Sequence, residues 1–173
     1  MSIDSNHTTR LSTDSLVHAL RMRPDLVLDF FVTFARFEYA LVAVGFVTDR
    51  RGVAEADWGC FLTFVEYLDR ADMEPGIQAG HRLLTKPPKK LVLDGQIARF
   101  REVRRTGQTD IRFLLEGVKR GRNNLFHGGK FLTGPQPVDR NETVVTDSLR
   151  VLRAVLEAPG MARLRQAYDE PPP

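Results

Sequence analysis

The sequence has little of what a disulfide-stabilised, secreted or membrane-embedded protein needs. A single cysteine, Cys60, cannot form a disulfide bond within the chain and fits a reducing compartment. The first fifteen residues, MSIDSNHTTRLSTDS, contain no apolar core, so we expect no secretory signal. The longest apolar run, residues 26–47, is interrupted by Asp29, Arg36 and Glu38 and is typical of a buried helix. We expect a cytoplasmic protein with no membrane partner.

Several kinds of active site also lack their usual sequence patterns. His7, His18 and His81 are isolated, and no spacing of Cys, His, Asp and Glu indicates a metal site. There is no glycine-rich loop to hold phosphate, and no Ser/His/Asp arrangement is recognisable. We therefore expect no metal and no cofactor.

What is present is an ordinary globular composition. The chain has 173 residues, of which 42% are hydrophobic and 27% charged, which is enough to bury one core. We expect a frayed N-terminus over 1–14, one helical domain over 15–169 and a Pro-rich tail over 170–173.

Apolar residues recur at spacings of three and four, which predicts an all-α bundle of four to six helices. Pro24 suits the first turn of a helix, Asp57 suits an N-cap, and Asp139 with Glu142 resembles a capping box. The expected helices run over residues 15–22, 24–47, 58–71, 77–85, 109–129 (ending at a glycine pair) and 139–168, with breaks at EPG (74–76) and at the Pro–Gly pair 159–160.

Residues 87–106 are ambiguous. The adjacent prolines of KPPKK end regular structure before this segment. LVLDG is compatible with a short extended piece, while QIARFREVRR has helical spacing, and we do not expect a strand there.

The segment VKRGRNNLFHGGKF, residues 118–131, conflicts with its own helical context. Glycine inside a helix costs about 1 kcal/mol relative to alanine, and asparagine competes with the backbone for hydrogen bonds. Such conflicts tend to occur at functional or strained sites. Between residues 99 and 130 there are nine basic and three acidic side chains. This charge favours an anionic partner such as RNA or a phosphate, although a solvated helix face explains it equally well.

Helical spacing places Arg120, Asn123 (or Asn124) and His127 on one face, with Arg122 on its flank. Histidine transfers protons near neutral pH, and arginine holds phosphate through two parallel hydrogen bonds. Together they suffice for RNA cleavage without a metal. The histidine would deprotonate the ribose 2′-hydroxyl, and the arginine would stabilise the charge that builds up on phosphorus.

RNNLFHGG resembles the motif of the HEPN superfamily (higher eukaryote and prokaryote nucleotide-binding), in which an arginine precedes a histidine by four to six intervening residues. FARFEYAL (residues 34–41) and the PPKK break extend the resemblance to a prokaryotic branch first named from a plasmid-borne hypothetical protein. The resemblance implies an all-α bundle whose homodimer brings two Arg/His motifs together across one cleft. Many members are metal-independent ribonucleases of toxin–antitoxin, phage-defence or RNA-processing systems.

On this basis we expect a metal-independent endoribonuclease that leaves a 2′,3′-cyclic phosphate. The family pattern selects Arg122, His127 and Asn123 as catalytic, although helix spacing also accepts Arg120. Supporting roles fall to Glu38, Asn124 and Arg120, and RNA contacts to Lys119 and Lys130. The alternative is a catalytically inactive HEPN module that binds RNA, a nucleotide or a partner protein, and an antitoxin or scaffold partner is a third possibility.

Simpler explanations exist for the same residues. His127 also fits the neutralisation of a helix C-terminal dipole, and the two asparagines also fit a poor helix end. Glu38 lies at the edge of an apolar stripe and needs a partner. That partner is either Arg36 or another base, in an ordinary intrahelical or bundle salt bridge, or it is Arg122 or His127, which Glu38 would then orient.

Overall fold

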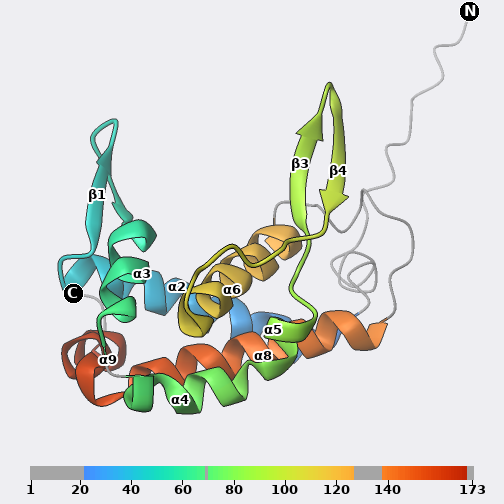
Figure 1. Ribbon diagram of the computed structural model, residues 1–173. Coiled ribbons are helices and arrows are strands. Elements are labelled where there is room, and N and C mark those ends of the chain that lie inside the picture. The colour runs from blue at the N-terminus through green and yellow to red at the C-terminus, as the bar shows by residue number, and fades with distance from the viewer. Residues whose placement is uncertain (1–21, 69, 127–137, 171–173) are drawn as a thin grey trace, which may run out of the picture.

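The computed structural model describes residues 22–68, 70–126 and 138–170, and these are mostly helical (Figure 1). The helices are α2 (Pro24–Ala43), α3 (Trp58–Glu66), α4 (Arg70–Ala79), α5 (His81–Thr85), α6 (Asp110–Phe126), α8 (Val138–Glu157), the 3-10 turn η1 (Pro159–Met161) and α9 (Ala162–Asp169). The strands form two antiparallel hairpins, β1 (Val47–Arg50) with β2 (Val53–Ala56), and β3 (Lys90–Asp94) with β4 (Ile97–Arg101). The prediction of a helical protein is confirmed, but the prediction that it is purely α-helical is wrong. No described helix is long and apolar enough to cross a membrane.

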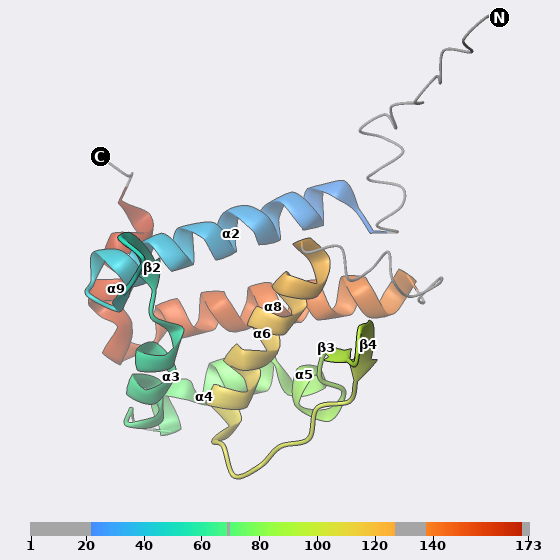
Figure 2. The same ribbon diagram turned by 90° about the horizontal axis from the view of Figure 1, so that it is seen from above.

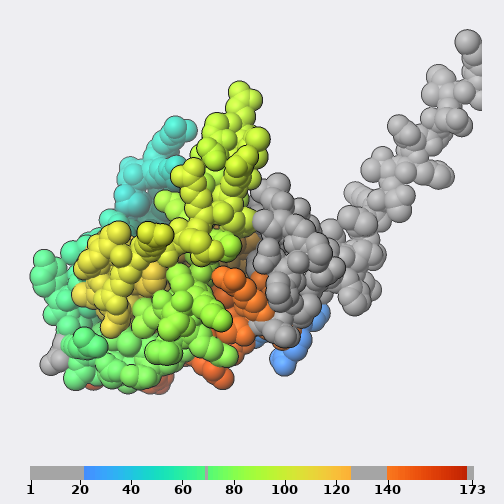
Figure 3. All heavy atoms as spheres, turned by 45° about the vertical axis from the view of Figure 1, so that its right-hand side comes forward, coloured from blue at the N-terminus to red at the C-terminus, as the bar shows by residue number. Residues whose placement is uncertain are grey.

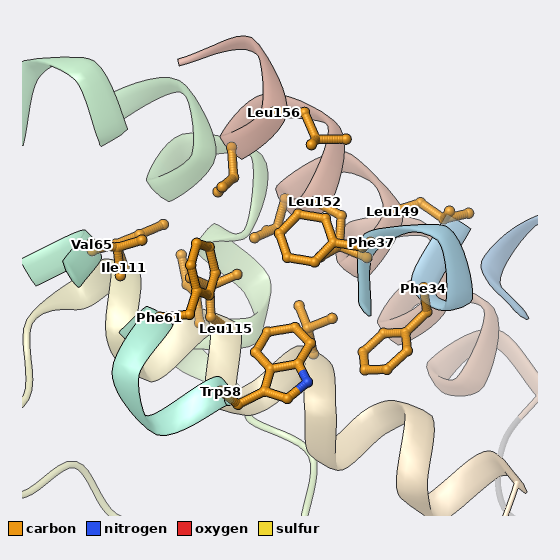
Figure 4. Packing of buried hydrophobic residues seen from close by; sticks show 14 of the residues in the cluster. Phe34, Phe37, Trp58, Phe61, Val65, Ile111, Leu115, Leu149, Leu152 and Leu156 are labelled. Carbon is orange, nitrogen blue, oxygen red and sulfur yellow. The ribbon is translucent and has the colours of Figure 1, made fainter. Parts of the chain in front are cut away.

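Helix α8 lies at the centre of the contacts, since α2, α4, α6 and α9 all pack against it (Figure 2). The inward residues of α2, α3, α6 and α8 form one hydrophobic cluster (Figure 4). Phe30, Phe37 and Phe61 are fully buried, and each large apolar side chain contributes about 1.5–3 kcal/mol when it leaves water. One carboxylate is buried as well: Asp147 of α8 accepts two hydrogen bonds from Arg82 of α5.

Helix α2 begins at Pro24 as predicted, but it ends at Ala43 and not near residue 47. The Phe46 N–H bonds the Leu41 carbonyl and the Gly45 N–H bonds the Val42 carbonyl, while Gly45 takes a positive φ of 98°. This is a Schellman cap, which needs a left-handed residue where glycine carries no strain. The chain then turns into β1.

The prediction that residues 87–106 contain no strand is wrong, because β3 and β4 pair from Lys90↔Arg101 to Asp94↔Ile97. The turn follows Asp94 at Gly95, whose φ is +63°. Asp94 pairs with Ile97, so the turn residues are Gly95 and Gln96. Glycine with a positive φ at the first turn position is a hairpin signal, and the helical spacing of Ile97 and Phe100 obscured it. The β1–β2 hairpin turns at Arg51 and Gly52, both with positive φ, and arginine is an unusual residue there.

The expected break at EPG is also wrong, since α4 continues through Pro75, whereas the expected helix over 58–71 ends at Glu66. Helix α4 packs directly on α6 and α8 at this point: a Cβ on Gly76 would lie 3.6 Å from side-chain carbons of both Ile111 and Val155, an ordinary van der Waals contact. The chain breaks at Gly80, where a Cβ would lie 2.6 Å from Val151.

Helix α6 opens at Thr109 and Asp110 as predicted, and the Thr109 hydroxyl accepts from the Arg112 N–H. Of the proposed capping box, the Asp139 side chain lies outside the described residues. Glu142 accepts a hydrogen bond from the backbone N–H of Arg23, 2.9 Å away, and so stabilises the start of α2. The expected helix over 15–22 and the helix end at residues 128–129 also lie outside the described residues, apart from Met22.

Candidate functional site

The last turns of α6 carry most of the residues selected from the sequence. Its apolar stripe, which includes Leu114, Leu115 and Val118, is fully buried against the other helices. That stripe fixes the rotation of the helix and therefore directs its polar residues to defined neighbours. Lys119 and Arg122, one turn apart, face α2 and the start of α3.

Glu38 of α2 is the centre of the polar contacts on this side. Its Oε1 accepts a hydrogen bond from the Trp58 indole N–H, 2.9 Å away, and its Oε2 lies 3.8 Å from Nη2 of Arg122. The predicted pairing of Glu38 with Arg122 is confirmed. The Arg36 alternative is wrong, because Arg36 donates to the backbone carbonyls of Tyr168 and Glu170.

Aromatic rings hold the two cations in place. The Arg122 guanidinium carbon lies 5.2 Å from the centre of the Phe34 ring, and Lys119 Nζ lies 5.1 Å from the centre of the Trp58 ring. Phe34 and Trp58 stack on each other where α2 meets α3 (Figure 4). Cations over aromatic faces gain about 0.5–2 kcal/mol, depending on desolvation. We call Phe34, Glu38, Trp58, Lys119 and Arg122 the Arg122 cluster.

The Arg122 cluster lies at the boundary between core and solvent. The side chains of Arg122 and Glu38 are 30% and 33% exposed, whereas Trp58 is buried. Burial lowers the pKa of the Lys119 ammonium, and the carboxylates of Glu38, Glu116 and Asp57 partly offset that effect. The cluster therefore presents two oriented cations to solvent above an aromatic base.

The two asparagines after Arg122 have different surroundings. The exposed Asn123 accepts a hydrogen bond from Nη1 of Arg122, 3.1 Å away, whereas Glu38 lies beside Nη2, so each terminal nitrogen of the guanidinium has a neighbour. Asn124 donates from Nδ2 to the Lys89 carbonyl, 2.8 Å away, and ties α6 to the base of the β3–β4 hairpin. Asn124 thus has a structural partner, and its supporting role at the catalytic site stays a prediction.

Arg120 is directed away from the Arg122 cluster. Its guanidinium lies over the ring of Phe113, and Nη1 is 3.6 Å from Glu116. Nε and Nη2 are buried without a hydrogen-bond partner among the described residues. Burial lowers the pKa of Arg120, and Glu116 partly offsets this. Of the two arginines that fit the family spacing, Arg122 is the more exposed and has a neighbour at each terminal nitrogen.

Gly121 has a packing explanation. A Cβ at this position would lie 3.2 Å from Val144 of α8 and 3.9 Å from Pro88, so glycine allows three segments to meet closely. Beside it lies a cavity of about 430 Å³ between α6, α8 and the β3–β4 hairpin. Its wall includes Pro88, Phe100 and Asn124.

His127 and Lys130 lie outside the described residues, so their positions relative to Arg122 stay predictions. Among the residues that the structure does describe, no group of three or more His, Cys, Asp or Glu side chains is placed to hold a metal ion. Sequence reasoning assigned Trp58 to the core alone. A buried indole N–H needs a hydrogen-bond acceptor, and the partly buried Glu38 was the residue from which that acceptor could have been predicted.

Comparison with known proteins adds no relative: no family model, no curated protein and no solved structure matches the chain.

Proposed function

We propose that the protein is a metal-independent endoribonuclease of HEPN type that acts as a homodimer. The observation that carries the proposal is the bracing of Arg122. Glu38, Asn123 and the Phe34 ring hold its guanidinium at a partly exposed position, five residues before His127. A cation fixed before the substrate arrives stabilises developing charge without reorganisation during the reaction.

The chemistry that follows needs only the residues of the motif and Lys119. His127 removes the proton from a ribose 2′-hydroxyl, and the 2′-oxygen attacks the adjacent phosphorus. Arg122 and Lys119 stabilise the added negative charge on the phosphoryl oxygens. The P–O5′ bond breaks, and the leaving oxygen takes a proton from the second copy of the motif. The products are a 2′,3′-cyclic phosphate and a 5′-hydroxyl.

The test compares two histidine variants on labelled RNA in the presence of EDTA. Wild type is expected to cleave and to leave a cyclic phosphate. His127→Ala should abolish cleavage, whereas His81→Ala, at an exposed position on α5, should cleave as wild type does. Cleavage that EDTA abolishes, or that His127→Ala leaves unchanged, contradicts the proposal. Binding of RNA by the wild type without any cleavage would support the catalytically inactive alternative.

The homodimer has its own test. One Arg/His motif is sparse for acid and base steps together, so we expect a two-fold dimer with its interface near residues 119–131. Sedimentation at micromolar protein should give twice the chain mass of 19.6 kDa. A monomer that retains full activity contradicts the shared site.

A further inference from the structure

The positive charge of the molecule is concentrated in one projecting segment. Residues 86–105 hold seven basic and two acidic side chains, a net charge of +5, while the whole chain carries +3. The segment consists of the β3–β4 hairpin and its flanks, and the hairpin stands out from the helices (Figures 1 and 3). A local positive field on a protrusion attracts polyanions more strongly than the modest net charge suggests.

The register divides the hairpin into two faces. Lys90, Arg99 and Arg101 lie on one face, because Lys90 pairs with Arg101 and Arg99 is two residues away along the strand. Leu91 and Phe100 pair on the other face and are partly buried. The basic face is exposed to solvent: the side chains of Arg99 and Arg101 are 61% and 63% exposed.

The basic face is costly for the hairpin itself. Like charges placed directly opposite each other, as Lys90 and Arg101 are, destabilise a strand pair. A hairpin without a third strand is already only marginally stable. Asp94 lies 3.8 Å from Arg99 and 3.5 Å from Arg101 and offsets part of this repulsion. Lys86, Lys90 and Arg104 have no carboxylate partner among the described residues.

The hairpin is connected to the helix that carries Arg122. Asn124, two residues after Arg122, donates a hydrogen bond to the Lys89 carbonyl at the base of β3. Both hairpins rise on the same side of the helices, and α6 runs between them in both views (Figures 1 and 2). A polyanion bound along the basic face would therefore reach the C-terminal end of α6.

We propose that the β3–β4 hairpin is an arm that binds the phosphate backbone of RNA through Lys90, Arg99 and Arg101. This inference rests on the proposed function for the choice of RNA. The arm contacts phosphates and carries no base-specific readout, so it holds substrate without selecting its sequence. An anionic membrane is the less suitable partner. The exposed apolar residues, Leu93 and Ile97, are few and lie on opposite faces of the hairpin, so they form no single apolar face.

The test measures RNA binding by anisotropy in a His127→Ala background with EDTA present, so that binding is read separately from cleavage. The probe is a fluorescein-labelled RNA stem-loop. The triple variant Lys90→Gln, Arg99→Gln, Arg101→Gln is compared with a control that also removes three exposed charges, Arg70→Gln, Arg163→Gln, Arg165→Gln. The hairpin variant should bind at least about tenfold more weakly near physiological salt, and its slope of log K against log salt should fall by about 2–3. The control should change the affinity less than about twofold.

A charge-conserving variant, Lys90→Arg, Arg99→Lys, Arg101→Lys, guards against a misfolded hairpin and should bind as the parent does. Equal affinity and equal salt slope in the hairpin variant and the control overturn the proposal. So does loss of binding to phosphatidylserine vesicles in the hairpin variant with unchanged RNA affinity. Hairpin-dependent binding by a protein that does not cleave RNA would remove the proposed activity and keep the arm. RNA cleavage by a protein whose RNA binding does not depend on the hairpin would keep the proposed activity and remove the arm.

Discussion

Between residues 117 and 124, helix α6 has two different faces. One face carries small residues and an asparagine that bonds a neighbouring carbonyl, and the other carries two cations held by neighbouring side chains. On the first face Gly121 lies against α8, and Asn124 bonds Lys89. On the second face Lys119 and Arg122 lie over aromatic rings, and Glu38 lies beside Arg122. The helix-propensity conflict in this segment therefore has two causes. The first face accounts for the glycine and for the second asparagine by packing, whereas the second face holds Lys119 and Arg122 through their charge, over aromatic rings and, for Arg122, beside Glu38.

The largest expected effect separates the two arginines. Arg122→Met should lower kcat/KM for RNA by about 10²–10³, the usual loss when one pre-oriented donor is removed from a transition state. Arg120→Met should leave the activity within about threefold and leave the free energy of unfolding unchanged or raised, because it removes a buried cation with unsatisfied nitrogens. Steady-state kinetics and urea unfolding of both variants check this. Equal losses of activity in the Arg122→Met and Arg120→Met variants would contradict the functional difference between the two faces.

Glu38 should give the next largest effect. Glu38→Ala leaves the buried Trp58 N–H and the Arg122 guanidinium without their shared acceptor, so it should cost about 1–3 kcal/mol of stability and most of the activity. Glu38→Gln keeps an acceptor for Trp58 but removes the charge that orients Arg122, so it should retain the fold and weaken RNA binding. Unfolding and anisotropy measurements on both variants are needed. Two substitutions with no effect on RNA would confine Glu38 to a structural role.

The sequence was sufficient for much of this site. Apolar residues at spacings of three and four located α2, α6 and α8. The partly buried position of Glu38 indicated that it needs a basic partner, and Arg122 was one of the candidates. It was insufficient where tertiary contacts decide the outcome. Nothing local shows that Gly121 meets Val144, or that Gly76, beside Pro75 inside α4, packs against α6 and α8. The β3–β4 hairpin was missed because an apolar spacing of three in QIARF outweighed the turn signal at Gly95.

The two asparagines offer a smaller and more selective test. Asn124→Ala should lower the free energy of unfolding by about 0.5–1.5 kcal/mol through loss of its bond to Lys89, with little change in RNA cleavage after correction for folding. Asn123→Ala should leave stability within about 0.5 kcal/mol, because the residue is exposed, and reduce cleavage severalfold by releasing one side of Arg122. Opposite results for the two positions would reverse the assignment of the faces.

The smallest effect concerns Lys119 and pH. Its pKa in the folded protein is lowered, so folding disfavours the charged form, and this cost is fully present below the folded pKa. The cost disappears as pH rises through the folded pKa toward 10.5, the ordinary pKa of a lysine side chain. Relative to Lys119→Met, wild type should gain less than about 1 kcal/mol between about pH 7.5 and about pH 10. Urea unfolding at both values measures the difference, and a constant difference would contradict the lowered pKa.

Trp58 is the single tryptophan of the chain, and its indole nitrogen bonds the same carboxylate that pairs with Arg122. Lys119 lies over the face of that ring. The tryptophan fluorescence of the protein, excited apart from its three tyrosines, therefore originates inside the Arg122 cluster. Any anion that draws Lys119 or Arg122 away from the cluster changes the electrostatic surroundings of the only indole. Occupancy of the site becomes readable as an emission change in the unlabelled protein.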